Sequence, residues 1–197
     1  MKKLFLALLA FVAMSASAQT KSVGEITWFP QFSLGYVHGS EMKSGNIDFG
    51  DWAQASIGFG GKYQVSEKFG ISAAATFAGM ASTEEKLAGV KASIKASYIE
   101  VPILASIDLS RNFGIQVGLK PSFKTSFELH LEDDGTKVDR KVEDMKGVVL
   151  YLPVGATYQF NSPLSLGFHY NFPLTKINKE EGSNKFHQFL LTLAYDI

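Results

Sequence analysis

The sequence predicts an all-β fold, an eight-stranded antiparallel up-and-down transmembrane β-barrel. Apolar and polar residues alternate over long stretches, as in strands with one face against an apolar medium. Three similar turns join pairs of these stretches through loops at 66–68, 110–112 and 161–163, and each loop has an apolar residue on both sides. These three hairpins supply six strands, and one flanking strand at each end makes eight. The flanking pairs are Val65 with Phe69, Leu109 with Phe113, and Phe160 with Leu164.

The segment ahead of the strands has the pattern of a secretory signal peptide. Lys2 and Lys3 precede an apolar run over 4–14, and Ala16-Ser17-Ala18 supplies the small residues that signal peptidase requires. A short transmembrane anchor is the alternative, but a run of about 11 residues falls well short of the roughly 20 that a helix needs. We therefore expect residues 1–18 to be the signal peptide and residues 19–197 to be an outer-membrane β-barrel domain.

Composition excludes several classes of function. The chain has 19 basic and 19 acidic residues, and removal of Lys2 and Lys3 leaves 17 − 19 = −2, which does not suit a nucleic-acid binder. The chain has no cysteine, which excludes a lipoprotein anchor, disulfides and thiolate metal sites. The length of 19–197 suits a single domain.

The first four strands are expected at 28–36, 53–65, 69–77 and 98–109. In each of them, apolar residues on one face oppose small or polar residues on the other. The apolar faces comprise Trp28, Pro30, Phe32, Leu34, Tyr36; Ala53, Ala55, Ile57, Phe59, Tyr63, Val65; Phe69, Ile71, Ala73, Ala75, Phe77; Ile99, Val101, Ile103, Ala105, Ile107 and Leu109.

The last four strands are expected at 113–123, 148–160, 164–172 and 188–197. The strand at 148–160 alternates most regularly, since every second residue from Val148 to Phe160 is apolar. The apolar faces comprise Phe113, Ile115, Val117, Leu119, Pro121, Phe123; Val148, Leu150, Leu152, Val154, Ala156, Tyr158, Phe160; Leu164, Leu166, Phe168, Tyr170, Phe172; Phe189, Leu191, Leu193, Tyr195 and Ile197.

The polarity of the two faces indicates which one looks inward. The polar face consists mostly of Gly, Ser, Ala, Gln and Thr, which fit the narrow interior of an eight-stranded barrel. The apolar face is aromatic at its ends and nearly free of charge, as lipid contact requires, and hydrocarbon demands a closed sheet. A soluble lipocalin-like ligand-binding barrel is the alternative, but its outer face should carry many long charged side chains.

Five charged residues fall on the inner face, where an unpaired charge would be costly. If Leu109 faces Phe113, the same register sets Glu100 opposite Ser122 and one diagonal step from Lys120. We therefore expect a Glu100–Lys120 ion pair across the lumen and a structural role for these charges. The five residues are Lys62, Glu100, Asp108, Lys120 and Asp196.

One segment resembles a known family. The stretch Tyr98-Ile-Glu-Val-Pro-Ile-Leu104, followed by Ser-Arg-Asn-Phe-Gly-Ile and Gly118, is similar to the central signature of the PorT-like outer-membrane β-barrel family. The resemblance covers most of the mature chain. It implies insertion in the outer membrane of a diderm bacterium, and the protein that gives the family its name is associated with secretion across that membrane.

The C-terminus fits the same location. Outer-membrane barrels resemble one another in ending on alternate apolar residues and a terminal aromatic, which the barrel-assembly machinery reads. Phe189, Leu191, Leu193 and Tyr195 match this alternation, whereas the final Ile197 departs from the usual Phe or Trp. We therefore expect outer-membrane lipid and the assembly machinery as partners.

The sequence offers weak signals for an enzyme or a pore. The histidines His38, His130, His169 and His187 show no metal-ligand spacing, and no metal or cofactor is predicted. His38 and Ser40 lie two apart and share a face if the strand continues, which leaves an acyl hydrolase acting on outer-membrane lipid as an alternative function. An open pore is not expected, because side chains fill the interior of an eight-stranded barrel.

The longest outer loop, at 124–147, is the candidate binding element. The apolar alternation of 113–123 continues beyond the roughly 9–11 residues that span a membrane. Asp133-Asp134-Gly135 supplies turn chemistry, and apolar residues return among charges. We expect a protruding hairpin with an exposed apolar stripe that docks a protein partner, or else rests on the membrane rim or a neighbouring loop. The stripe comprises Phe127, Leu129, Leu131, Val138 and Val142.

Overall fold

The computed structural model describes residues 23–39, 43–44, 47–48, 51–82, 85–87, 90–133, 136–141, 146–160, 162–177 and 185–197. Both the expected signal peptide, 1–18, and its cleavage site therefore lie outside the described residues. The strands are β1 (Ile26–Gly39), β2 (Lys43–Ser44), β3 (Ile47–Asp48), β4 (Asp51–Gln64), β5 (Phe69–Ser82), β6 (Glu85–Leu87), β7 (Val90–Glu100), β8 (Ile103–Asp108), β9 (Phe113–Asp133), β10 (Thr136–Lys141), β11 (Val148–Gln159), β12 (Leu164–Pro173) and β13 (Phe186–Tyr195).

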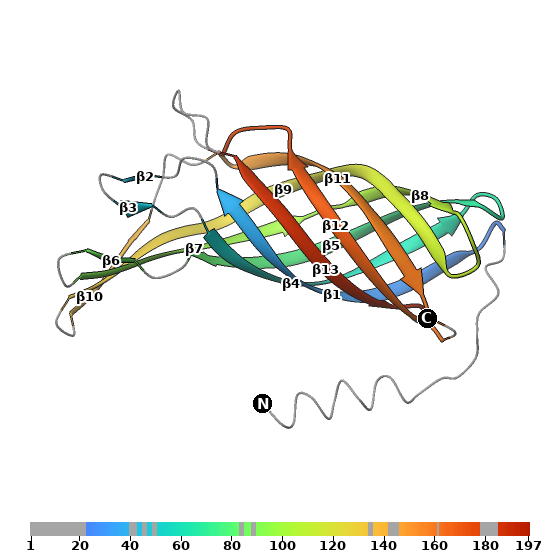
Figure 1. Ribbon diagram of the computed structural model, residues 1–197, viewed down its shortest axis with the longest axis horizontal. Coiled ribbons are helices and arrows are strands. Elements are labelled where there is room, and N and C mark those ends of the chain that lie inside the picture. The colour runs from blue at the N-terminus through green and yellow to red at the C-terminus, as the bar shows by residue number, and fades with distance from the viewer. Residues whose placement is uncertain are drawn as a thin grey trace.

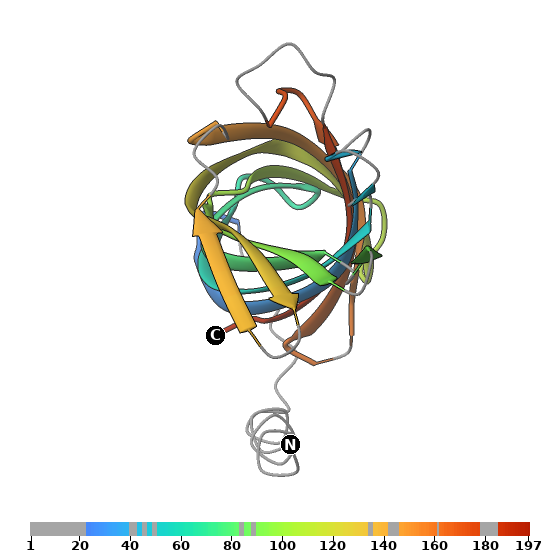
Figure 2. The same ribbon diagram turned by 90° about the vertical axis from the view of Figure 1, so that its left-hand side faces the viewer.

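The long strands close into an antiparallel barrel with eight strand positions around its wall, which we call staves (Figures 1 and 2). β1, β4, β5, β9, β11, β12 and β13 form one stave each, and β7 with β8 forms the eighth. Closure comes from the pairing of β13 with β1, together with the pairing of β7 and β8 with β9. The predicted fold class is confirmed. Within the described part of the chain, no helix has the length and apolar character to cross a membrane.

The stave formed by β7 and β8 is interrupted at Val101 and Pro102. Proline has no backbone N–H to donate to the ladder, so the strand pairing lapses there. The chain nevertheless stays in place, because Val101 N donates to Pro121 O at 2.9 Å and Pro102 O accepts from Ala74 N at 3.1 Å. The register of β8 with β9 then continues the register of Glu100 with Ser122.

The three short turns have the geometry that their sequences predict. The residue before each loop donates its backbone N–H to the carbonyl oxygen of the residue after it, with N···O distances of 2.9 Å for Val65–Phe69, 2.9 Å for Leu109–Phe113 and 3.0 Å for Phe160–Leu164. Loop serines add bonds to the returning strand, as in Ser66 Oγ with Phe69 N and Ser110 Oγ with Phe113 N. The turns are therefore fixed by local hydrogen bonds.

Both ends of the barrel domain lie beside these short turns. Ile197 N donates to Trp28 O at 2.8 Å, so the last residue pairs with the first strand. In outer-membrane barrels the short turns mark the periplasmic end and the longer connections lie outside the cell. We call these two ends the turn end and the outer end.

The outer wall of the barrel is apolar. Along each stave the large apolar side chains predicted to face lipid are exposed, as in Ile57 at 65% and Phe168 at 54%. The buried positions between them are mostly small or polar, including Ser56, Ser72, Thr76 and Ser106. This inside-out distribution suits a hydrocarbon surrounding, and the soluble lipocalin-like alternative is wrong.

One inner-face glycine is required by close approach of the backbone. A Cβ on Gly118 of β9 would overlap the carbonyl oxygen of Ile103 in the neighbouring β8. The overlap involves backbone on both strands, so a side chain here would force the staves apart. Gly118 thus holds β8 against β9 just after the interruption at Pro102.

Beyond the barrel, β9 continues as part of a protruding sheet. β9 is 21 residues long, and its outer part pairs with β7 on one side and with β10 on the other, while β6 pairs with β7 (Figure 1). We call the outer parts of β7 and β9, together with β6 and β10, the outer sheet. The predicted protruding hairpin is therefore present.

The outer part of β9 does not keep the outward apolar face that we expected. Tyr98 pairs with Lys124 but Ser97 pairs with Ser126, so Thr125 is an extra residue that forms a β-bulge. Beyond the bulge, side chains of β9 exchange faces, and Phe127 is only 4% exposed. The expectation that Phe127 continues the outward apolar face was wrong, because a bulge shifts the alternation by one residue.

Candidate functional site

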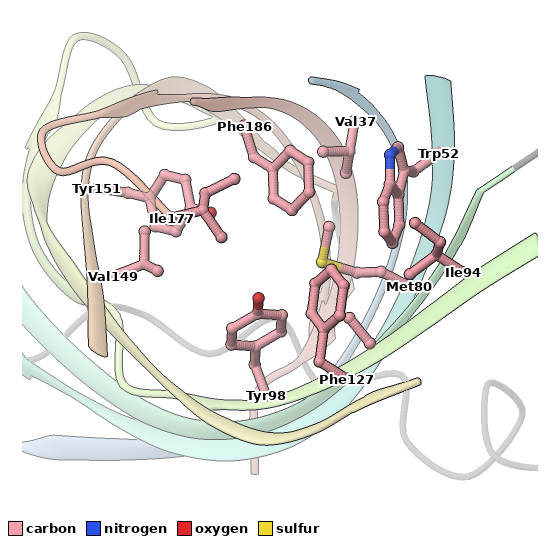
Figure 3. Close-up of a cluster of buried hydrophobic side chains, with 11 residues drawn as sticks. Val37, Trp52, Met80, Ile94, Tyr98, Phe127, Val149, Tyr151, Ile177 and Phe186 are labelled. Atoms are coloured by element: carbon pink, nitrogen blue, oxygen red, sulfur yellow. The ribbon is translucent and has the colours of Figure 1, made fainter. Parts of the chain in front are cut away.

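A cluster of apolar side chains fills the lumen at the outer end of the barrel (Figure 3). Its members come from most of the staves and point toward the barrel axis, and each is at most 6% exposed. We call this cluster the plug. It comprises Val37, Trp52, Met80, Ile94, Ala96, Tyr98, Phe127, Val149, Tyr151, Ile177 and Phe186.

Aromatic contacts hold the centre of the plug together. The ring of Trp52 on β4 lies 5.0 Å from that of Phe186 on β13 and 5.9 Å from that of Phe127 on β9. Aromatic pairs at such distances stabilise beyond their buried area. Because none of these three strands is a neighbour of another in the barrel, the contacts link separate parts of the wall.

Tyr98 and Tyr151 fall on the inner face of the strands expected at 98–109 and 148–160, opposite the apolar residues, whereas most of the plug was not predicted. The signal was present in the alternation itself. Trp52 stands two residues before the inward Gln54, and Phe186 stands two before the inward Gln188. These positions fall on the inner face by parity, but they lie outside the strand bounds that the sequence suggested.

A buried polar network lies next to the plug, on the side that faces the turn end. Lys120 Nζ donates to Glu100 Oε1 at 2.9 Å, which is the ion pair that the predicted register implied. Both residues are nearly inaccessible, Glu100 at 2% and Lys120 at 3%. Lys120 also donates to Gln188 Oε1 at 2.6 Å and lies 4.9 Å from the ring centroid of Tyr151. The ammonium group is therefore surrounded by acceptors and a ring face.

Other side chains complete the network. Asn171 Nδ2 donates to Gln188 Oε1 at 2.9 Å, and Ser122 Oγ donates to Glu100 Oε1 at 3.3 Å. Such hydrogen bonds satisfy the carboxylate lone pairs and ammonium hydrogens that the ion pair itself leaves unpaired. The network therefore permits full burial of two opposite charges inside the barrel.

The remaining lumen charges lie nearer the turn end. Lys62, Asp108 and Asp196 line, together with Glu100 and Lys120, an inner cavity of about 130 Å³. All five charged residues assigned to the inner face therefore do face the lumen. The cavity lies between the buried network and the turn end, and the plug closes the other side.

The only residue pair singled out for catalysis lies at the outer rim of the wall. His38 faces outward near the end of β1, and its Nδ1 lies 3.0 Å from Oδ1 of Asp51, the first residue of β4. Tyr36 Oη donates to the same carboxylate, and hydrogen bonds from Tyr36 and then His38 lower the pKa of Asp51. Ser40, the other member of the predicted pair, lies outside the described residues.

A second histidine stands beside the first. His187 of β13 pairs with His38 in the β1–β13 register, and its Nδ1 lies 2.6 Å from Oη of Tyr170. The sequence could not bring these residues together, because their proximity depends on barrel closure. His169, by contrast, faces the lumen and contacts Gln116 at 2.7 Å.

The hairpin residues fall into three groups. Phe127 is in the plug, whereas the backbone pairs Leu129 with Ile94 and Leu131 with both Ala92 and Val138. The register thus sets these positions on the sheet face that includes Phe127 and Ile94. Val142 lies outside the described residues. No group of three or more His, Cys, Asp or Glu suited to a metal ion occurs among the residues that the structure describes.

The sequence and fold match known outer-membrane proteins. A family model described as outer membrane protein beta-barrel domain matches residues 4–196. None of the curated proteins matches the sequence.

Many solved structures match this fold, and two of them serve as examples. Neisserial surface protein A (NspA) has a TM-score of 0.56 at 11% identity, with 88% of this chain and 99% of that chain covered. Ail, the attachment invasion locus protein of Yersinia pestis, has a TM-score of 0.51 at 12% identity, with 89% of this chain and 100% of that chain covered. At such identities the likeness extends to the fold.

Proposed function

The chain belongs to the outer membrane protein beta-barrel domain family, and from this premise we propose that it is a closed barrel that anchors a docking surface outside the cell. The proposed docking surface is the outer sheet, and the proposed role is structural, adhesive or partner-docking. The observation that carries the proposal is β9, whose 21 residues far exceed the roughly 9–11 that cross a membrane.

The filled lumen supports an anchor rather than a pore. Solutes crossing this barrel would have to displace both the plug and the hydrogen-bonded Glu100–Lys120 pair. Rearrangement of either would cost much free energy, since the plug is closely packed and the ion pair is fully buried. The surface outside the membrane is then the part left for recognition.

The backbone register of the outer sheet aligns residues of opposite charge, which suits a polar partner. In the register, Lys95 stands opposite Glu128, which in turn stands opposite Lys141 of β10. Four residues farther along β9, the register aligns Lys91, Glu132 and Lys137 in the same order of charge. Rows of alternating charge give register-specific complementarity, and they also discourage unspecific strand addition at the edge of β10.

The test of this proposal is a trimmed outer sheet. Residues 129–142 are replaced by a short Gly/Ser turn, which retains Phe127 and therefore the plug. We expect the barrel to assemble, because the strands within the membrane keep their register. Proteins crosslinked to the intact barrel in outer membranes should be lost from the trimmed variant.

A matched control replaces residues 178–184, which separate Ile177 from Lys185 in the sequence, with a Gly/Ser linker of equal length. This control should retain the crosslinked partners. Partners that survive trimming of the outer sheet unchanged would show that docking takes place elsewhere. Heat-dependent migration in electrophoresis checks that both variants fold.

The finer assignments also belong to the proposal. We propose that the chain reaches the outer membrane after cleavage behind Ala18 and is inserted by the barrel-assembly machinery, which would read the alternate apolar residues that end at Ile197. The resemblance of residues 98–104 to the PorT-like signature supports the same setting. A secretion component among the crosslinked partners would extend the resemblance to function.

A lipid acyl hydrolase is a second candidate, favoured by one contact. Asp51 holds Nδ1 of His38 at 3.0 Å, as a triad carboxylate holds its histidine, and Ser40 lies two residues along the chain. The docking proposal predicts that His38→Ala leaves the acyl chains of membrane lipids unchanged in mass spectrometry. Loss of an acyl-chain modification in that variant would instead favour the hydrolase.

A further inference from the structure

Polar side chains form a row across the outer wall where the apolar surface ends. Asp51 of β4, His38 of β1, His187 of β13 and Tyr170 of β12 follow one another on four adjacent strands, and Lys185 precedes β13. We call these residues, together with Tyr36, the rim cluster. Toward the turn end, the same strands present large apolar side chains such as Leu34, Phe168 and Leu191, which are 51–54% exposed.

Aromatic rings mark this level as the membrane interface. The rings of Tyr170 and Phe189 lie 4.9 Å apart, and Tyr36 lies 6.4 Å from Phe189. Such girdles sit at the head-group level of outer-membrane barrels. The rim cluster is therefore placed beside lipid head groups rather than beside acyl chains.

The hydrogen bonds within the rim cluster bear on which ring nitrogen of each histidine is left to bind a ligand. The Asp51 carboxylate can only accept, so Nδ1 of His38 donates to it, and Nε2 also carries a hydrogen whenever both ring nitrogens are protonated. A neutral His187 whose Nδ1 accepts from the Tyr170 hydroxyl also carries its hydrogen on Nε2. Neither Nε2 has a hydrogen-bond partner among the described residues.

The two donors are close enough to share one ligand. His38 and His187 are directly opposite in the ladder, and such residues have Cβ atoms about 4.5–5.5 Å apart. Lys185, whose Nζ lies 5.9 Å over the ring of Phe172 at the same rim, adds a positive charge. The negative charge of Asp51 is offset by its bonds to Tyr36 and His38.

We propose that the rim cluster binds the phosphate group of an anionic lipid in the outer leaflet, with His38 and His187 donating to its oxygens and Lys185 supplying charge. Tetrahedral phosphate oxygens suit several convergent donors, and charge-assisted bonds to them are the strong ones. A lipid is the expected source because the cluster lies on the membrane-facing wall, at head-group level. This inference is independent of the outer sheet and its partner.

The test is lipid retention by the full-length barrel. The protein is purified in detergent, exposed to equal amounts of phosphatidic acid and phosphatidylcholine with the same acyl chains, and analysed by native mass spectrometry. Wild type should retain phosphatidic acid preferentially. Loss of a hydrogen bond to a charged group weakens binding about tenfold, so His38→Ala/His187→Ala should lose most of this preference.

Control variants separate recognition from folding. His130→Ala removes a histidine from outside the cluster and should keep the preference. His38→Gln/His187→Gln maintains polar bulk without a cationic donor, and it should lose the preference even if the alanine variant fails to fold. Asp51→Asn, which removes the carboxylate beside His38, should weaken the preference as a positioning change.

Three results would overturn the proposal. In the first, wild type shows no preference for phosphatidic acid. In the second, the double variants fold and keep the preference. In the third, inorganic phosphate displaces phosphatidic acid at equal concentration. The last result would indicate a site for free phosphate rather than for a lipid.

Discussion

Lys120 is the residue on which the electrostatics of the lumen depend most. Its ammonium group compensates Glu100, and the two lie where water has almost no access. Loss of one partner from a buried ion pair leaves an uncompensated charge, which costs more than the pair contributes. Replacement of both partners by neutral groups avoids that cost.

We therefore predict that Lys120→Met lowers the free energy of unfolding by about 3–5 kcal/mol, because Glu100 remains buried without its counter-ion. The measurement is urea unfolding of the barrel in lipid vesicles. Glu100→Gln/Lys120→Met should recover most of the loss. Lys68→Met, a change at an exposed turn lysine, is the control and should stay within about 0.5 kcal/mol of wild type. Equal losses in the single and double variants would contradict the ion-pair account.

At the scale of elements, the β-bulge at Thr125 decides which way the outer part of β9 faces. Before the bulge Phe123 is 42% exposed, whereas after it Phe127 is 4% exposed and contacts Trp52. One extra residue thus turns an apolar stripe from the lipid side to the lumen side. The plug depends on this exchange of faces.

Deletion of Thr125 should consequently loosen the plug, because the alternation would then turn Phe127 outward. The deletion is made in a Trp28→Phe background, which leaves Trp52 as the remaining one of the two tryptophans. We expect stronger acrylamide quenching of Trp52 fluorescence than in the parent. Thr125→Ala keeps the chain length and should quench like the parent. A deletion variant that also quenches like the parent would show that the plug does not need the bulge.

Sequence patterns captured the elements whose alternation is unbroken. The turns at Val65, Leu109 and Phe160 and the inward Glu100 and Lys120 follow from a period of two, which the structure keeps. A bulge leaves no clear mark in sequence, so Phe127 was given the wrong face. The contact of His38 with Asp51, and its pairing with His187, depend on register and closure, which periodicity does not encode.

At the scale of the whole molecule, the predicted signal peptide sets the residue at which the mature chain should begin. We predict that the mature protein begins at Gln19, because signal peptidase cleaves after a small residue such as Ala18. N-terminal sequencing of protein purified from outer membranes checks this. Recovery of the apolar run over 4–14 in the purified protein would contradict it.

We propose that the whole barrel is an anchor whose lumen is sealed by the plug and by the buried polar network next to it. Planar-bilayer recording of the refolded mature protein tests this most directly. We predict no discrete conductance steps, although heat-dependent migration shows the protein to be folded, because apolar side chains fill the outer mouth. Reproducible single-channel steps from folded wild-type protein would contradict the sealed barrel and restore a pore as its function.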